Sequence, residues 1–270
     1  MRRFLVFLAL SFFLPSSGVV RTEVRLPVIM YHHVTEDVSK AGDYVVTTAQ
    51  LEGDLKYLRD HGCTAVSAAQ LVDFCLGQGN LPEKPVLITF DDGQLSVLDY
   101  ALPLLEKYDM CAVAALVGAY CDREERLEYR SPEYSYMTWF EAGQLAASGR
   151  FELAAHTQSM HEECRPRRGC LPKNSEPEDA YRLALNSDLE TVERSIENAS
   201  GYRPYVFAYP FGFHCDLSDS ILSERGYSVV LTCESRVNVL TGEPSELMSL
   251  ARFNRPASAD RERFFAMLGL

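Results

Sequence analysis

Short apolar segments alternate with amphipathic helical segments along almost the whole chain, and this alternation limits the possible folds more than any other feature. Runs rich in β-branched and aromatic residues predict strands, whereas leucines at helical spacing after a Ser or Thr cap predict helices. The expected strands are residues 24–31, 64–67, 85–90, 111–117, 151–155, 205–208 and 228–232. The expected helices are residues 48–62, 68–77, 96–108, 138–148, 177–200 and 217–225. This order indicates parallel βα units and an α/β fold.

The number of βα units favours one α/β domain that closes, or nearly closes, into a barrel. A doubly wound open sheet is the alternative. We find no sequence repeat, low-complexity tract or linker that would divide the chain into domains. A nucleotide-binding site is not expected, because neither GxGxxG nor GxxxxGK[ST] follows any predicted strand.

The charge of the chain argues against two classes of partner. It has 270 residues, with 38 acidic and 26 basic side chains and a formal net charge of −12. A nucleic-acid-binding protein needs a basic face to neutralise phosphates, and an acidic chain is repelled by anionic lipid. We therefore expect no nucleic acid and no specific membrane partner, and a neutral substrate fits best. The oligomeric state stays open.

The first 18 residues, MRRFLVFLALSFFLPSSG, have the composition of a secretory signal peptide. Two arginines precede an apolar run of eleven residues, and a Pro, two Ser and a Gly follow that run. The run is well short of the roughly 20 residues that span a bilayer. An uncleaved anchor or a buried first helix are the alternatives. The sequence therefore predicts an exported protein, extracellular or associated with the cell envelope, with its catalytic domain in residues 19–270.

Eight cysteines follow this segment, and an even number in an exported chain permits disulfides. The best candidate is Cys164–Cys170, which spans CRPRRGC. Closing this short loop would contribute about 2 kcal/mol. No CxxC pair occurs, which argues against a cysteine zinc site.

Chemically active residues follow four of the predicted strands at the same end. They are His32 and His33 after the first strand, Asp91 and Asp92 after the strand at 85–90, His156 and then His161 after the strand at 151–155, and Tyr209 with Pro210 after the strand at 205–208. Sites in α/β barrels are built at the carboxyl ends of the strands. This convergence predicts a functional site there.

Two histidines and a carboxylate at these strand ends predict a divalent metal site. Such a set leaves coordination positions open and suits Zn²⁺, Fe²⁺, Co²⁺ or Ni²⁺. Two adjacent carboxylates after an apolar strand are costly unless they are paired or bound to metal. An Asp-Gly turn at Asp91–Asp92, and two unrelated loop histidines at His156 and His161, are the alternatives. His61 and His214 are expected to be structural or at the surface.

Four motifs together resemble the polysaccharide deacetylases of carbohydrate esterase family four, the NodB-homology family. They are TFDDG at residues 89–93, HTQSMH at 156–161, YPFG at 209–212 and YHHV at 31–34. The resemblance runs from about Leu26 to Phe253. The YHHV start resembles a subgroup with poly-N-acetylglucosamine deacetylases, in which the motif order is circularly permuted. The resemblance implies a distorted (β/α)7 barrel, as a single domain.

The resemblance also implies a role for each motif residue. Asp92, His156 and His161 would bind the divalent metal, with Zn²⁺ the first choice. Asp91 would be the general base, His32 the general acid, and Tyr209 would lend its backbone N–H to the oxyanion. Most members carry the acid histidine near the carboxyl end, but no histidine follows His214 in this chain. His33 is the alternative to His32.

The resemblance, together with the predicted signal peptide, implies an exported metal-dependent hydrolase that acts on carbon–nitrogen bonds other than peptide bonds. It would remove N-acetyl groups from an N-acetylglucosamine-type polysaccharide or peptidoglycan and release acetate. Aromatic residues including Trp139, Tyr134, Tyr136, Phe211 and Phe213 could stack on sugar rings, although Trp139 is expected to be a packing residue. Asp91→Asn is expected to remove activity with little change in stability. The alternatives are a deacylase for another amide or ester, and a catalytically weak carbohydrate-binding protein.

Overall fold

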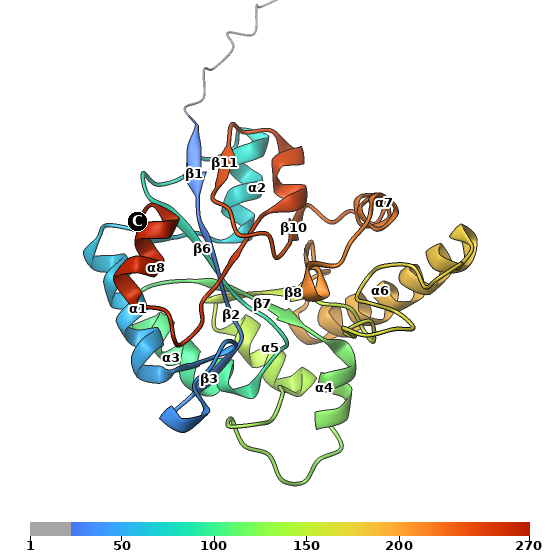
Figure 1. Cartoon of the computed structure of the whole chain (residues 1–270), viewed down its shortest axis with the longest axis horizontal. Coiled ribbons are helices and arrows are strands. Elements are labelled where there is room, and N and C mark those ends of the chain that lie inside the picture. The colour runs from blue at the N-terminus through green and yellow to red at the C-terminus, as the bar shows by residue number, and fades with distance from the viewer. Residues whose placement is uncertain (1–22) are drawn as a thin grey trace, which may run out of the picture.

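The computed structural model describes residues 23–270, so the expected signal peptide, residues 1–18, lies outside the described residues. Its centre is a parallel sheet with the strand order β10-β9-β8-β7-β6-β2-β12, and a short strand β5 pairs with β6. Figure 1 shows β2, β6, β7 and β8 of this sheet at the centre of the molecule. The bounds are β2 Val28–Tyr31, β5 Thr64–Ala65, β6 Pro85–Phe90, β7 Ala112–Leu116, β8 Phe151–Ala155, β9 Val206–Ala208, β10 Val229–Leu231 and β12 Phe253–Asn254.

The sheet curls, and the segment that leads into the edge strand β12 also contacts β10, the strand at the opposite edge. Leu250 forms a parallel bridge with Leu231, and its N–H donates to the carbonyl of Val230 at 2.8 Å. Three residues later the same segment pairs with β2, where Phe253 lies opposite Ile29. Strand order follows chain order from β2 to β10, whereas a doubly wound sheet reverses direction part-way. The expected distorted (β/α)7 barrel in one domain is therefore confirmed over the doubly wound alternative.

The helices begin where the sequence places good caps. Thr47, Ser67 and Thr138 each form a capping box with the Gln or Glu three residues later, which fixes the starts of α1, α2 and α5. The bounds are α1 Thr48–Asp60, α2 Ala68–Leu76, α3 Leu102–Lys107, α4 Gly118–Glu124, α5 Trp139–Ala147, α6 Glu178–Ser200, α7 Asp216–Glu224 and α8 Arg261–Leu268. Across residues 23–270 we find no helix with the length and hydropathy needed to span a membrane.

Several elements differ from the sequence prediction. The run at 24–31 is divided at Pro27 into β2 and β1, Val24–Leu26, which pairs antiparallel with β11, Asn238–Leu240. A small separate sheet joins β3, His33–Thr35, to β4, Val45–Thr47. The helices α4 and α8 were also not predicted. β3, β4 and β11 have three residues each, too few to establish a period-two pattern.

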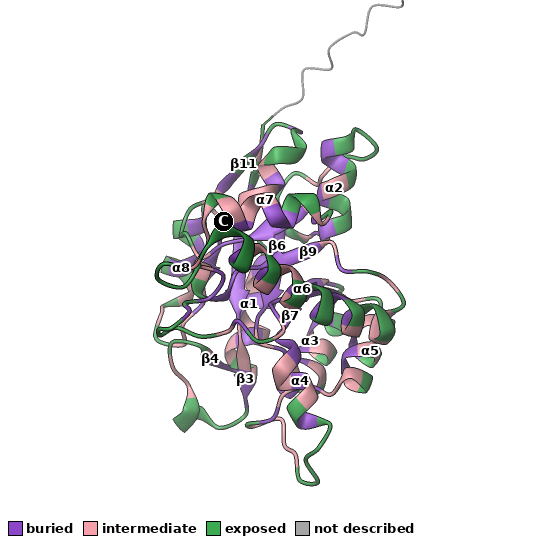
Figure 2. Cartoon of the chain, turned by 90° about the vertical axis from the view of Figure 1, so that its right-hand side faces the viewer, coloured by how far each residue is buried: buried purple, intermediate pink, exposed green. Residues whose placement is uncertain are grey.

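Alternate strand residues bury two apolar faces, which Figure 2 shows as the purple centre of the molecule. On β6, Ile88 and Phe90 pack in the cluster shared with the outer helices, whereas Leu87 belongs to the cluster that holds Val28, Val113 and Ala154 from the neighbouring strands. Because side chains alternate, Asp91 continues the row of Leu87 past the strand end. By the same alternation, His32 lies on the same face as Val28, and His156 lies on the same face as Ala154.

All eight cysteines lie in the described part of the chain, and neither Cys164 nor Cys170 takes part in a disulfide. The expected Cys164–Cys170 disulfide is therefore absent from this structure. Cys164 is exposed on its loop, whereas Cys170 is fully buried.

Candidate metal centre and active site

The three predicted metal ligands meet at the carboxyl end of the sheet. One ligand atom from each of Asp92, His156 and His161 lies within 4.8 Å of the other two. Oδ1 of Asp92 is 3.2 Å from Nε2 of His161 and 3.7 Å from Nε2 of His156. The three side chains come from two loops that follow β6 and β8, as the sequence analysis expected.

The turn after β6 points the two carboxylates in different directions. Asp92 and Gly93 both adopt left-handed backbone conformations, with φ of 72° and 77°. Such a conformation is uncommon for a residue with a side chain, although aspartate adopts it more readily than most, and residues of this kind cluster at functional sites. A Cβ on Gly93 would lie 3.0 Å from Cδ2 of Leu116, so glycine allows the turn to pack closely on β7. Asp92 therefore reaches the histidines, while Asp91 stays at the strand end.

His156 is oriented as a metal ligand needs to be. Its Nδ1 lies 2.7 Å from the carbonyl oxygen of Ala208, and a carbonyl only accepts, so Nδ1 carries the proton and Nε2 keeps its lone pair. Burial lowers the pKa of His156 to about 4, even though Asp91 and Asp92 act in the opposite direction. The imidazole is therefore neutral near pH 7. His161 is held by the hydroxyl of Tyr120, which lies 3.2 Å from its Nδ1.

Asp91 is bound by Arg252, which was not among the predicted site residues. Nη1 and Nη2 of Arg252 donate to its two oxygens at 2.7 and 2.8 Å, and the Arg252 side chain is fully buried. Burial alone would raise the pKa of Asp91, but the attraction of Arg252, His156 and His32 outweighs it and holds that pKa well below its usual range. An arginine among apolar residues, as in SLARF at 249–253, was the sequence pattern that could have indicated it.

His32, and not His33, faces this site. His32 lines a cleft together with the two aspartates, the two ligand histidines and the side chains of Met30, Tyr44, Glu163, Phe211, Phe213, Cys233 and Asn254. Its ring lies 4.9 Å from that of Tyr44. His33 belongs to β3, and its Nδ1 lies 3.2 Å from the amide oxygen of Gln94. The two other histidines lie elsewhere: His61 stacks on Tyr57, and His214 stacks on Tyr209.

Tyr209 does not fit the expected oxyanion role. Its N–H donates to the carbonyl of Leu231 at 3.0 Å, in the parallel pairing of β9 with β10, so it is already bound. Its side chain is buried, and its hydroxyl donates to Asp219 at 2.8 Å. On the same turn the N–H groups of Gly212 and Phe213 bond back to Tyr209 and Pro210. Proline has no N–H, so within this described turn only Phe211 keeps an N–H for a ligand.

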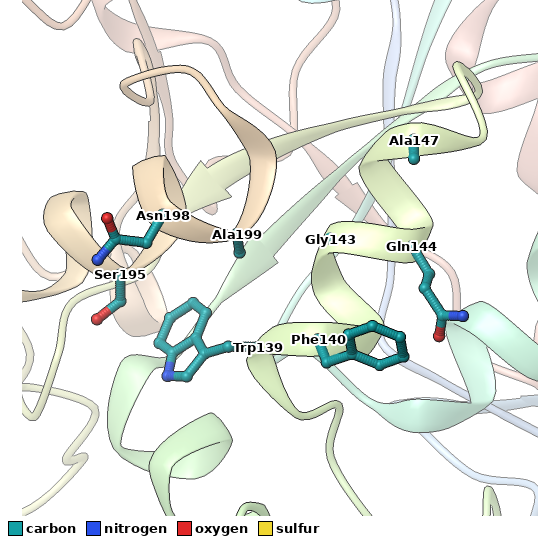
Figure 3. A pocket seen from close by; sticks show the side chains of 8 residues that line it. All are labelled: Trp139, Phe140, Gly143, Gln144, Ala147, Ser195, Asn198 and Ala199. Atoms are coloured by element: carbon teal, nitrogen blue, oxygen red, sulfur yellow. The ribbon is translucent and has the colours of Figure 1, made fainter.

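The aromatic residues expected to stack on sugars lie in different places, and Tyr134 and Tyr136 do not line the cleft. Phe211 and Phe213 line the cleft, and the ring of Phe211 lies 4.6 Å from that of His161. Trp139 instead lies in a groove between α5 and α6, with Phe140, Gln144 and Ser195 among the lining side chains (Figure 3). Its Nε1 donates to Asp122 at 2.8 Å.

The chain matches a known protein family over the strands that carry the predicted metal ligands. The polysaccharide deacetylase model matches residues 78–230, more than half of the chain. The chain belongs to the polysaccharide deacetylase family. The matched region includes Asp91, Asp92, His156 and His161, whereas His32 and Arg252 lie on either side of it. That placement agrees with the permuted motif order that the YHHV start indicated.

Named relatives of this polysaccharide deacetylase support the same assignment. The chain is 27% identical over 226 residues to poly-beta-1,6-N-acetyl-D-glucosamine N-deacetylase of Escherichia coli strain K12, covering 77% of this chain and 34% of that protein. It is 22% identical over 196 residues to the Staphylococcus aureus MRSA252 protein of the same name, covering 72% of this chain and 63% of that one. The chain thus spans about a third of the first relative and just under two thirds of the second.

A solved structure agrees with the fold. The de-N-acetylase from Aggregatibacter actinomycetemcomitans superimposes with a TM-score of 0.78 at 23% identity, over 90% of this chain and 99% of that one. At this identity the likeness establishes the fold only.

Proposed function

We propose that this polysaccharide deacetylase is an exported, divalent-metal-dependent hydrolase that removes acetyl groups from a poly-N-acetylglucosamine-type polysaccharide and releases acetate. The observation that carries the proposal is the division of labour between two adjacent carboxylates. Asp92 lies with His156 and His161 within 4.8 Å, while Asp91 is held apart by Arg252.

The donor set fits a divalent metal, with Zn²⁺ the first choice and Co²⁺, Ni²⁺ or Fe²⁺ compatible. Asp92, His156 and His161 would hold the ion through one carboxylate oxygen and two imidazole nitrogens, a set that leaves positions open for water and substrate. The hydrogen bond from His156 to Ala208 supports this reading, because it fixes the tautomer that leaves Nε2 available. When bound, such an ion polarises the amide carbonyl and lowers the pKa of a water molecule.

The remaining steps fall to residues of the cleft. Asp91, which Arg252 keeps ionised, accepts a proton from the attacking water. The tetrahedral oxyanion needs a fixed donor, and we assign the N–H of Phe211 in place of that of Tyr209. His32 protonates the leaving nitrogen, so the C–N bond breaks to give acetate and an amine. The open cleft wall with Tyr44, Phe211 and Phe213 offers apolar faces for sugar rings.

The proposed substrate class and the proposed export of the protein have separate support. The names of the two curated relatives favour poly-β-1,6-N-acetylglucosamine over peptidoglycan. A neutral polymer is also compatible with the net charge of −12. Export rests on the predicted signal peptide at residues 1–18.

The test is acetate release from N-acetylglucosamine oligomers, with peptidoglycan, acetylxylan and small cyclic imides as competing substrates. We expect release from the oligomers, loss with a chelator and recovery with Zn²⁺. The control variant His214→Gln removes an imidazole that lies outside the metal cluster and should keep activity. Release from another substrate alone, or release that a chelator does not affect, would contradict the proposal.

A further inference from the structure

The loop between the two ligand histidines is held by a carboxylate from α6. Asp188 accepts a hydrogen bond from the backbone N–H of Gln158 at 2.7 Å and from that of Ser159 at 2.8 Å. The two N–H groups are neighbours in the chain, so a single carboxylate satisfies both. The loop that they belong to begins at His156 and ends at His161.

The backbone of this loop needs such support. Thr157, which directly follows His156, has a φ of 69°, a left-handed conformation that is strained for a β-branched residue. Successive N–H groups after a left-handed residue form a concave site for an anion, and the Asp188 carboxylate occupies this position. Strain of this kind persists only where surrounding contacts hold the backbone in place.

Contacts from α4 hold the opposite side of the loop. The N–H groups of Gly118 and Ala119 donate to the carbonyls of Thr157 and Gln158 at 3.0 and 2.7 Å. The Gln158 side chain also donates to Asp122 at 2.7 Å, the same residue that binds the indole of Trp139. These contacts place the carbonyls, whereas Asp188 places the N–H groups nearer to His161.

From this arrangement we infer that Asp188 is a positioning residue for the metal site: it fixes the loop that sets the spacing of His156 and His161. The inference rests on the proposed function, since it takes these histidines as ligands. Asp188 itself is not a ligand and acts through the backbone of Gln158 and Ser159. Such outer contacts typically change metal affinity tenfold to a hundredfold.

The experiment compares Zn²⁺ affinity in the whole chain, by competition with a chromogenic chelator, for wild type, Asp188→Asn and Asp179→Asn. Asp179 is exposed on the same helix, so its variant removes the same charge without touching the loop. We expect Asp188→Asn to weaken Zn²⁺ binding by about tenfold or more. The absorption spectrum of bound Co²⁺ should change with it, whereas Asp179→Asn should match wild type in both measurements.

Two further readouts separate positioning from loss of the fold. Amide hydrogen exchange at Gln158 and Ser159 should accelerate in Asp188→Asn, while the far-ultraviolet circular dichroism stays that of wild type. Asp188→Glu provides a second variant that keeps the charge and should recover part of the affinity. Equal Zn²⁺ affinity in wild type and Asp188→Asn would overturn this inference and leave the proposed function intact. A wild-type chain that binds no divalent metal would overturn both.

Discussion

Arg252 and Asp91 form a two-pronged ion pair in which the Arg252 side chain is fully buried and the Asp91 side chain is 3% exposed, at the edge of the cleft. Nη1 and Nη2 of Arg252 lie 2.7 and 2.8 Å from the two carboxylate oxygens, and Nε donates to the carbonyl of Thr232 at 2.9 Å. Arg252 lies between Leu250, which bridges to β10, and β12, which pairs with β2. The pair therefore connects the end of β6 to the segment that closes the barrel. Under the proposed function it also holds the general base.

Asp91→Asn should lose stability as well as activity. The substitution leaves the Arg252 charge buried without its counter-ion, and removing one member of a buried pair typically costs about 3–5 kcal/mol. The expectation from sequence alone, that stability would hardly change, is therefore replaced. The measurement is the free energy of unfolding in guanidinium chloride.

The double variant Asp91→Asn/Arg252→Gln provides the control. Because it removes both charges, it should be less destabilised than the sum of the two single variants, while activity stays absent. Additive free energies of unfolding would contradict the coupling that we infer from the contact distances.

His32→Ala should reduce kcat by about 10²–10⁴-fold with little effect on KM, as expected for loss of a general acid. His33→Ala should retain most of the activity, because His33 contacts Gln94 and does not line the cleft. Steady-state kinetics on a soluble oligomer, with matched unfolding temperatures, measures both. A larger loss of kcat in the His33 variant would reverse the assignment.

Local patterns predicted the part of the site that follows strand ends. Period-two alternation along β2, β6 and β8 places His32, Asp91 and His156 on the inner side, and a left-handed turn with glycine directs Asp92 toward His161. These features depend only on residues that are close together in the chain, so they can be predicted from the sequence.

Contacts between distant segments could not be predicted in this way. Arg252 reaches Asp91 across 161 positions, and no periodic pattern encodes that separation. The N–H of Tyr209 is bound because β10 pairs with β9 in one particular register, which only the assembled sheet defines. Asp188 lies in the middle of a helix that otherwise resembles any amphipathic surface helix.

His161→Gln should lower Zn²⁺ affinity sharply, since it removes one of three ligand atoms, while leaving the fold intact because His161 lies at the surface of the cleft. His214→Gln is the matched control, since His214 contacts Asp219 and Tyr209 outside the cluster. Isothermal titration of metal-free protein with Zn²⁺ compares the two. Equal affinities would exclude His161 as a ligand.

Acid should weaken the attachment of the β3 region through Glu133. This carboxylate accepts hydrogen bonds from the Thr35 hydroxyl at 2.5 Å, from Lys40 at 3.1 Å and from the N–H of Glu36 at 3.3 Å. Burial acts to raise its pKa, but these donors outweigh burial and lower the pKa from 4.5 to about 2. The folded state therefore binds the proton more weakly than the unfolded chain does.

The sign of the pH dependence follows from that difference. The stabilisation from Glu133 is complete above pH 4.5, the ordinary pKa, and is lost as the pH falls from there to about 2. Glu133→Gln should thus be less stable than wild type at pH 7, and the difference in unfolding free energy should shrink as acid is added. Glu128→Gln, at an exposed position before the same loop, removes a carboxylate in the same way and should change the unfolding free energy little at pH 7. A constant difference for Glu133→Gln between pH 7 and pH 3 would mean that the Thr35 and Lys40 contacts do not hold the charged form.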